Sequence, residues 1–271
     1  MNYQYQLAIA AIFRDEARFL KEWIEFHREV GFEHFYLFDN LSTDSYQEIL
    51  QPYIESGIVE LFSWPIEHSN ESDWDYLQRL AYERAIYFAK GKVKWLAFID
   101  IDEFLFPAKE IALKDLLSQY EGFGGIGINW QVFGTSGVER IPDGRLLIET
   151  LYRKLPFADA VNHTIKTLAQ PDRIRGCLSS HVMSYKEGFF QANTDGIRFE
   201  GKKSPYVQID TLRINHYRCR DDHFLHTQKI PRIRKWWNTQ SPEAWASYFE
   251  SFNAISDVSI HRYIPKLKFR M

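Results

Sequence analysis

The segment WLAFIDIDEFLFP, residues 95–107, places Asp100, Asp102 and Glu103 within an otherwise apolar run. Burying an unpaired carboxylate is costly, so these acids need a hydrogen-bond donor, a cation or a metal ion. Side chains two residues apart on an extended strand point the same way, which predicts that Asp100 and Asp102 converge on one cation. Oxygen ligands favour Mg²⁺ or Mn²⁺, and such an ion keeps positions open for phosphate oxygens. Glu103 is expected to face away and to pair with a basic side chain.

Two other interpretations of these acids stay open at this point. They could cap the next segment or pair with Lys and Arg at the end of a strand. They could also belong to a phosphohydrolase of the haloacid dehalogenase type, in which an apolar strand precedes D-x-D and the first Asp is the nucleophile. That pattern usually lies near the N-terminus and continues with Thr or Val. Here Glu103-Phe104 follows, and three predicted strands precede.

The elements that must position the acids alternate between strand and helix. Apolar runs predict strands over 7–13, 34–38, 58–64 and 93–101, and amphipathic spacing predicts helices over 19–30, 45–57 and 73–91. Such alternation is typical of an α/β fold with a mostly parallel, open sheet and helices on both faces. Ligands of such sheets bind at the carboxyl ends of the strands, where Arg14, Asp15, Asp39 and Asp100 stand.

The second half of the sequence is less regular. It predicts a helix over 113–120, a glycine-rich strand through Trp130 with a flexible FGTSG loop after it, and strands over 163–168 and 178–185. A further strand ends in His216, and helices are predicted over 224–237 and 243–254. We expect one domain in three parts: a nucleotide-sugar-binding half (1–107), an acceptor and metal half (108–222) and a basic helical extension (223–271).

Charge and composition narrow the classes of partner. The net charge of −3 argues against a domain that binds nucleic acid. The extension is nevertheless rich in Lys and Arg, which could face phosphates or an anionic membrane surface or simply be solvated. Two cysteines do not make a disulfide framework. Neither a signal-peptide pattern nor an apolar run of ~20 residues is evident, so we expect a cytoplasmic protein, at most peripheral to the inner face of a membrane.

Four segments in this order resemble the glycosyltransferase family 2-like and family 92 group, which has a GT-A fold. IFRDEARFLKEWIEFHREVGFEHFYLFDNLSTD is similar to the opening of that group, and WLAFIDIDEFLFP to its metal-binding D-x-D motif. INWQVFGTSG and INHYRCRDDHFLHTQK resemble two later motifs. The resemblance implies a metal-dependent transfer of sugar from a nucleoside-diphosphate sugar, expected to be a UDP-sugar, to a glycan or lipid-linked glycan.

The resemblance also implies roles for single residues. Asp39 would accept a hydrogen bond from the nucleotide base, in a pocket lined by Arg14, Asp15 and Gln78. The metal ligands would be Asp100, Asp102 and His216, and Asp100 would also touch the donor. The chain departs from the usual pattern at RCRDD, which leaves open whether Arg218, Arg220 or Lys229 contacts phosphate. Trp130 would stack on the acceptor or fill the core, and His27 is expected to be a core histidine.

Transfer with inversion, which the resemblance suggests, needs a base for the acceptor hydroxyl. No motif identifies that base. Glu149 is the candidate we name, because it follows the FGTSG loop and opens a predicted helix, and the other acids that stay open are Glu139, Asp143, Asp159 and Asp195. A partner subunit that binds a sugar nucleotide or a glycan without transferring sugar is the alternative from another class.

Overall fold

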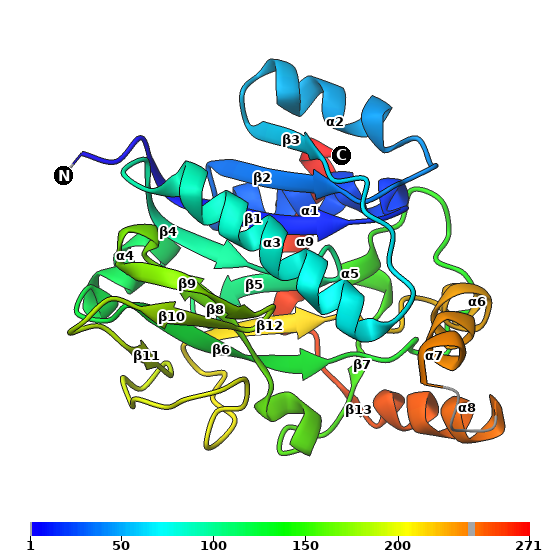
Figure 1. The fold of residues 1–271 in the computed structure, drawn as a ribbon. Helices are drawn as coiled ribbons and strands as arrows, with labels where there is room; N and C mark the ends of the chain where they lie inside the picture. The colour runs from blue at the N-terminus through cyan, green and yellow to red at the C-terminus, as the bar shows by residue number, and fades with distance from the viewer. Residues whose placement is uncertain (1, 238–241) are drawn as a thin grey trace.

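The structure is a computed structural model, and it describes residues 2–237 and 242–271. Its first half alternates strands with helices, as predicted (Figure 1). The strands are β1 (Tyr5–Phe13), β2 (His34–Asp39), β3 (Val59–Ser63) and β4 (Val93–Phe98), and the helices are α1 (Ala17–Val30), α2 (Tyr46–Glu55) and α3 (Glu71–Ala89). The four strands are parallel and lie in the order β3-β2-β1-β4.

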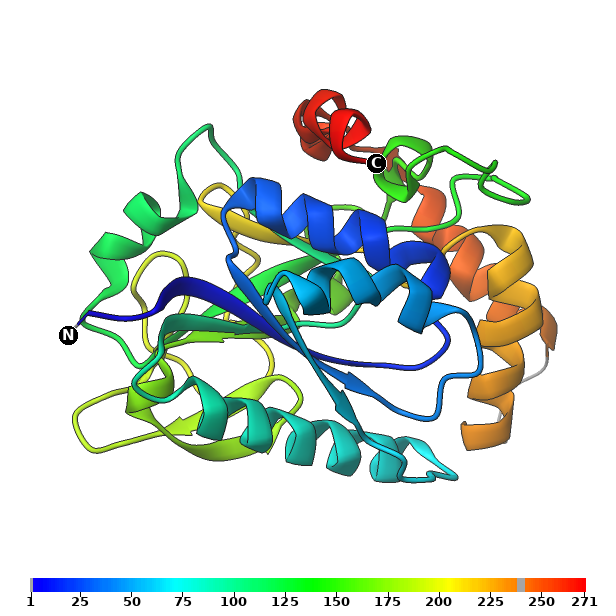
Figure 2. The same ribbon diagram turned by 90° about the horizontal axis from the view of Figure 1, so that it is seen from above.

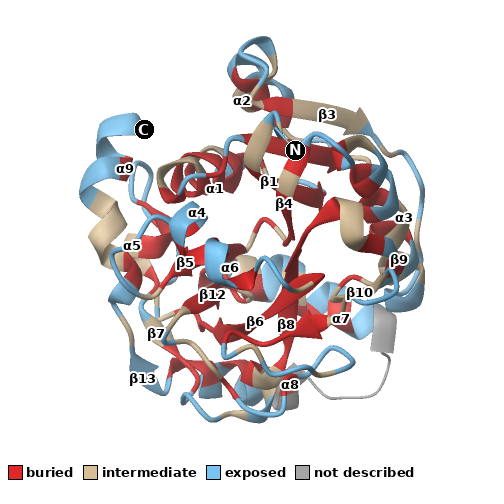
Figure 3. Cartoon of the chain, turned by 90° about the vertical axis from the view of Figure 1, so that its left-hand side faces the viewer, coloured by how far each residue is buried: buried red, intermediate tan, exposed pale blue. Residues whose placement is uncertain are grey.

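The continuous apolar run of β1 is explained by two hydrophobic cores, one on each face of the sheet. Ile9 and Phe13 pack with residues of α1 and α2 in the first core, whereas Ala8 and Ile12 pack with residues of α3 in the second. Figure 2 shows α1 and α2 on one side of the sheet and α3 on the other. Figure 3 shows that the strands of the sheet are mostly buried. The predicted helices on both faces are confirmed.

The second half extends the same sheet. In the described part of the chain the sheet has nine strands in the order β3-β2-β1-β4-β8-β6-β12-β5, with β11 beside β6. β8 is antiparallel to both β4 and β6, and β5 is antiparallel to β12, while the other pairs are parallel. The elements of this half are β5 (Glu103–Pro107), α4 (Leu113–Leu116), η1 (Leu117–Tyr120), β6 (Gly125–Val132), α5 (Leu147–Thr150), β7 (Arg153–Lys154), η2 (Ala160–His163), β8 (Ile165–Ala169), η3 (Pro171–Arg173), β9 (Ile174–Ser179), β10 (Val182–Tyr185), β11 (Gln191–Ala192) and β12 (Leu212–His216).

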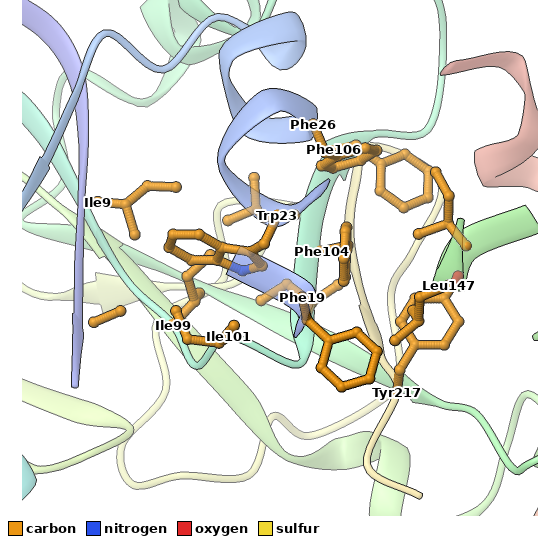
Figure 4. Packing of buried hydrophobic residues seen from close by; sticks show 14 of the residues in the cluster. Ile9, Phe19, Trp23, Phe26, Ile99, Ile101, Phe104, Phe106, Leu147 and Tyr217 are labelled. Atoms are coloured by element: carbon orange, nitrogen blue, oxygen red, sulfur yellow. The ribbon is translucent and has the colours of Figure 1, made fainter. Parts of the chain in front are cut away.

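The sheet is curled, because the short connection between β4 and β5 would not fit a flat sheet. A tight turn joins these two strands, yet three other strands separate them in the sheet. In a flat sheet they would be roughly 19 Å apart at the usual strand spacing. The curl brings β5 beneath α1, where Phe104 and Phe106 pack against Phe26 (Figure 4). The indole N–H of Trp23 also donates to the carbonyl of Glu103 at 2.8 Å.

His27 of α1 lies in this same contact. Its Nδ1 binds the carbonyl of Trp23 at 2.8 Å, and its Nε2 accepts the N–H of Leu105 at 3.2 Å. Burial lowers the pKa of His27 to about 3, so the ring is neutral. The prediction of a core histidine is confirmed.

The C-terminal part returns to the first half of the molecule. It comprises α6 (Asp222–Phe224), η4 (Leu225–Lys229), α7 (Ile230–Trp237), α8 (Pro242–Glu250), η5 (Ser251–Asn253), β13 (Ile255–Ser256), η6 (Ser259–Tyr263) and α9 (Ile264–Arg270). On α9, Lys266 and Arg270 pair with Glu29 of α1 at 2.6 and 3.1 Å. These cations are therefore partly neutralised by carboxylates of the same chain. Among the described residues, no helix is both long and apolar enough to cross a membrane.

Candidate metal and nucleotide site

Asp100 and Asp102 lie in the turn between β4 and β5. The N–H of Glu103 donates to the carbonyl of Asp100 at 3.0 Å, and the Glu103 carboxylate accepts the N–H of Asp100 at 3.0 Å. The prediction that one strand continues to residue 101 is wrong, because β4 ends at Phe98. The alternation argument for Asp100 and Asp102 fails with it, since alternation holds only for extended backbone. The two carboxylates have different partners.

Asp100 is held by protein groups at both of its oxygens. The amide of Gln78 donates to Oδ1 at 2.5 Å, and the ammonium of Lys166 donates to Oδ2 at 2.9 Å. Lys166 is buried and also lies 3.7 Å from Glu103, which confirms that Glu103 pairs with a basic side chain. The prediction that Glu103 faces away from Asp102 is wrong, because ligand atoms of the two residues lie within 4.8 Å of each other. Burial opposes the charge of Lys166, but Asp100 and Glu103 outweigh it and raise its pKa. The role of Asp100 as a metal ligand stays a prediction. To bind a metal ion through Oδ2, Asp100 would have to break its ion pair with Lys166.

Lys166 was not anticipated from the sequence. The signal was nevertheless present, because Lys166 lies within the short strand β8, whose sequence is IKTLA, and a lysine in a buried strand needs an anion beside it. Gln78, predicted to face the nucleotide, is buried on α3 and serves as the other partner of Asp100.

Asp102, Glu103 and His216 form a candidate metal-binding group, which is called the metal cluster below. One ligand atom from each lies within 4.8 Å of the others, and Asp100 is not a member of the group. Nε2 of His216 is 3.5 Å from Oδ1 of Asp102. The buried Oε1 of Glu103 and Nδ1 of His216 have no hydrogen-bond partner among the described residues. Two carboxylates, an imidazole and unpartnered buried atoms fit a divalent cation.

Burial lowers the pKa of His216, despite the opposing charge of Asp102. A neutral imidazole keeps a lone pair, which metal binding requires. The β12–β5 pairing positions this side chain, because His216 stands opposite Glu103 in the register.

Cations surround the metal cluster on the side of the C-terminal segment. Asp102 lies in the electrostatic field of Arg220 and Lys229, and Lys229 lies in that of Arg218. The guanidinium of Arg220 is buried and donates to Glu16 at 2.7 Å, while its Nε and Nη1 have no hydrogen-bond partner among the described residues. Burial and the neighbouring arginines lower the pKa of Lys229 to about 7. The charges of the predicted phosphate contacts Arg218 and Lys229 thus act on the same group of residues, since both lower the pKa of His216.

The loops after β1 and β2 are tied together beside this cluster. Asp15 accepts from the N–H of Thr43 at 2.7 Å, and Asp39 accepts from the N–H of Ser42 at 3.0 Å and from the hydroxyl of Tyr46 at 3.0 Å. Asp15 has φ 55°, which is the left-handed region that L-residues rarely adopt. These contacts fix the shape of the strand ends.

Arg14 is exposed on the same loop and lies 3.7 Å from Asp15. The predicted positions of Arg14, Asp15 and Asp39 at one edge of the sheet are thus confirmed. Their contact with a nucleotide stays a prediction.

Trp130 connects the metal cluster to a second histidine. Its ring centroid lies 4.4 Å from that of His216 and 5.3 Å from that of His181. Only 9% of Trp130 is exposed, which leaves little surface for stacking on a sugar. Its buried indole N–H has no hydrogen-bond partner among the described residues, and so can donate to a ligand.

The FGTSG loop after β6 is fixed in place, contrary to the expected flexibility. The hydroxyl of Ser136 accepts the N–H groups of Tyr152 and Arg153 at 2.8 and 2.9 Å. The N–H of Ser136 in turn donates to Asn253 at 2.7 Å.

Three of the five acids predicted as candidate bases have other partners, and the other two are exposed. Glu149 pairs with Lys268 at 2.7 Å and with Arg145 at 3.3 Å, so it is bound to α9 and not to the metal cluster. Asp159 accepts the N–H of Val161, and Asp195 accepts from Gln208 and Tyr206. Glu139 and Asp143 are exposed. None of these acids belongs to the described group around Asp102.

Comparison with known proteins identifies the family of this chain. The family model described as glycosyltransferase family 92 matches residues 4–264. A family 92 protein of Ricinus communis is 25% identical over 223 residues, which are 79% of this chain and 35% of that protein. One of Oryza sativa subsp. japonica is 29% identical over 221 residues, with 79% and 33% covered. The chain thus spans about a third of the length of these curated relatives.

Solved structures give more distant likenesses. Staphylococcus aureus TarS, residues 1–349, has a TM-score of 0.43 and 11% identity, with 90% of this chain and 69% of that chain covered. Glucosyl-3-phosphoglycerate synthase from Mycobacterium tuberculosis has a TM-score of 0.30 and 17% identity, with 46% and 44% covered. The assignment rests on the match over residues 4–264, not on these superpositions. On that match, the chain belongs to glycosyltransferase family 92.

Proposed function

We propose that this chain transfers a sugar from a UDP-sugar to a hydroxyl group of a glycan, with a divalent metal ion at the donor diphosphate. One observation carries the proposal: Asp102, Glu103 and His216 form a group that could hold a metal ion, and the charges of Arg218 and Lys229 act on that group. A leaving diphosphate gains most from a site with both kinds of group, because its charge grows in the transition state. Membership of family 92 supports the transferase class.

The metal ion would be held by Asp102 and His216, with Glu103 as the third ligand. When bound, it offsets the charge on the departing diphosphate. We propose Mn²⁺ over Mg²⁺, because an imidazole suits later transition metals better than Mg²⁺.

The nucleoside would lie over the ends of β1 and β2. Asp39 already accepts two protein hydrogen bonds, but a carboxylate has about four acceptor positions, so a base N–H can still bind it. Arg218 and Lys229 would contact the diphosphate. The orphaned indole N–H of Trp130 would donate to a hydroxyl of a bound sugar.

We propose inversion by direct attack of the acceptor. A covalent intermediate would need a free carboxylate nucleophile near the cluster. Three acids outside the cluster are paired with cations: Asp100 with Lys166, Glu16 with Arg220, and Asp221 with Arg18. A phosphohydrolase with Asp100 as nucleophile is disfavoured for the same reason, since both oxygens of Asp100 are occupied.

The test is UDP release from a panel of UDP-sugars, with glycosides as acceptors, in the presence of Mn²⁺ and again with EDTA. We expect Asp102→Asn to abolish release and to weaken Mn²⁺ and UDP binding at least tenfold in titration calorimetry. The variant should fold normally, because the side chain lies in a turn and keeps its size. Asp115→Asn, at an exposed position on α4, is the matched control.

Two outcomes would count against the proposal. Unchanged Mn²⁺ and UDP binding in Asp102→Asn would show that the metal site is elsewhere. Binding of UDP-sugars by the native chain without transfer or UDP release would instead favour a non-catalytic binding subunit.

A further inference from the structure

The proposed transfer needs a group that takes the proton from the acceptor hydroxyl, and none of the acids suggested by the sequence belongs to the group around Asp102. His181 stands between β9 and β10, and none of the motifs discussed above includes it. Its ring packs on Trp130, whose ring also contacts His216 of the metal cluster. A single aromatic side chain thus separates His181 from the proposed metal ligands.

The hydrogen bonds of His181 fix its tautomer. Nδ1 lies 2.8 Å from the carbonyl oxygen of Ile165, and a carbonyl oxygen can only accept. Nδ1 must therefore carry the proton, and Nε2 carries the lone pair. Nε2 has no hydrogen-bond partner among the described residues, and it is not among their fully buried, unsatisfied atoms. It is an accessible proton acceptor.

The backbone around His181 is anchored on both sides. Thr167 of β8 donates its hydroxyl to the carbonyl of His181 at 2.7 Å. The hydroxyl of Ser180 donates to Asp75 of α3 at 2.8 Å. The imidazole is thus held to β8 and α3, two elements that also carry the partners of Asp100. Such fixed placement is what general base catalysis requires.

Burial, more than any charged neighbour, keeps the ring neutral before reaction. Burial, and then the charge of Lys166, lower the pKa of His181 to about 4, while Asp100 opposes them. The ring is therefore neutral at neutral pH, and its Nε2 is unprotonated. Once it does, the carbonyl of Ile165 continues to accept from Nδ1, and Asp100 offsets part of the new charge.

We propose that His181 is the general base that deprotonates the acceptor hydroxyl, which rests on the glycosyltransferase function proposed above. The acceptor oxygen forms a bond to the anomeric carbon as its proton moves to Nε2. The bond between that carbon and the diphosphate oxygen breaks, and its electron pair leaves with the diphosphate. The imidazolium then returns the proton to water.

Two substitutions separate this role from a structural one. His181→Asn keeps a donor close to the carbonyl of Ile165 but removes Nε2. His181→Ala leaves space that added imidazole can enter. His163→Gln is the matched control, because His163 also binds a backbone carbonyl, that of Ser204, through Nδ1 at 3.0 Å and is half-buried.

The experiment measures UDP release with UDP-glucose, UDP-galactose and UDP-N-acetylglucosamine, with p-nitrophenyl glycosides as acceptors, and UDP binding by calorimetry. We expect kcat to fall by about 10²–10⁴-fold in both His181 variants, as is typical for loss of a general base. The Kd for UDP should stay within about twofold, and imidazole should restore part of the rate of His181→Ala only.

The outcomes are distinguishable. If His181→Asn keeps kcat within threefold of the native chain, or if kcat and UDP binding fall together without imidazole rescue, His181 is not the base. If the native chain neither binds UDP-sugars nor releases UDP, the transferase proposal fails, and the role of His181 falls with it.

Discussion

At the scale of single residues, Lys229 lies in an environment that favours a bound anion. It is half-buried, and Arg218 and Arg232 lie close enough to act on its charge. These cations and burial bring its pKa to about 7 in the free protein, so near neutral pH a large share of the side chain is uncharged. An anionic diphosphate bound beside it would raise that pKa and draw in a proton.

Because protonation of Lys229 and binding of the diphosphate favour each other, the proposed nucleotide binding should depend on pH. The protonated form of Lys229 binds the diphosphate better, so affinity is full below the pKa of the free protein and falls as pH rises through and above about 7. We expect UDP affinity to fall at least fivefold, on the order of 1 kcal/mol, between pH 7 and pH 9. Calorimetry in buffers of different ionisation enthalpy should show uptake of a fraction of a proton near pH 7.5.

The control for this prediction is a pair of substitutions. Lys229→Met should weaken UDP binding at pH 7 and flatten the dependence on pH. Lys114→Met, at an exposed position of α4, should leave both unchanged. An equally steep dependence in Lys229→Met would assign the titration to another group.

At the scale of elements, the loop after β6 depends on a close contact with η5. A Cβ built on Gly134 would lie 2.2 Å from Oδ1 of Asn253 and 2.9 Å from the backbone carbon of Phe252. The same Oδ1 holds the N–H of Ser136. We expect Gly134→Ala to cost about 1–3 kcal/mol of unfolding free energy, measured by urea denaturation, because the neighbours would have to shift.

Gly122→Ala is the matched control for this substitution. No atom lies within 4 Å of a Cβ at Gly122, and its backbone is not left-handed, so we expect a change within about 0.5 kcal/mol. Equal stability of the two variants would show that the loop yields easily, and that its hydrogen bonds do not hold it.

The strands and helices of the first half could be predicted from the sequence, but the contacts of the site could not. The strands β1 to β3 and the helices between them followed from periodicity, because each has a clear apolar face or run. The side-chain partners of the acids in the β4–β5 turn could not be predicted from periodicity. The grouping of Asp102 with Glu103, and the pairing of Asp100 with Lys166, depend on a turn that interrupts an apolar run. The sequence predicts a single strand over 178–185, whereas the structure has the β9–β10 hairpin, because the reversal between the two strands contains no Gly, Pro, Asn or Asp to mark it.

At the scale of the whole molecule, α9 joins the end of the chain to α1 and α5. Its ion pairs with Glu29 and Glu149 are largely at the surface, where each pair contributes only about 0–1 kcal/mol. Leu267 is fully buried in the first core, whereas Phe269 is 95% exposed. Burial, more than charge, is therefore expected to hold α9 in place.

We expect Leu267→Ala to lower the free energy of unfolding by about 2–5 kcal/mol, through lost burial and a cavity. Phe269→Ala, two residues away on the same helix, should change it by no more than about 0.5 kcal/mol. Thermal and urea denaturation give both values. A smaller effect for Leu267→Ala than for Phe269→Ala would mean that this helix is docked differently.

The curl of the sheet has a consequence for the order in which the molecule forms. Asp102 and His216 come from distant parts of the sequence and meet only because β12 pairs with β5 across the turn that carries the acids. Until β12 has been synthesised, the nascent chain contains Asp102 but lacks His216. Metal binding at the proposed site would therefore come late in folding, after β12 has paired with β5 and the curled sheet has closed.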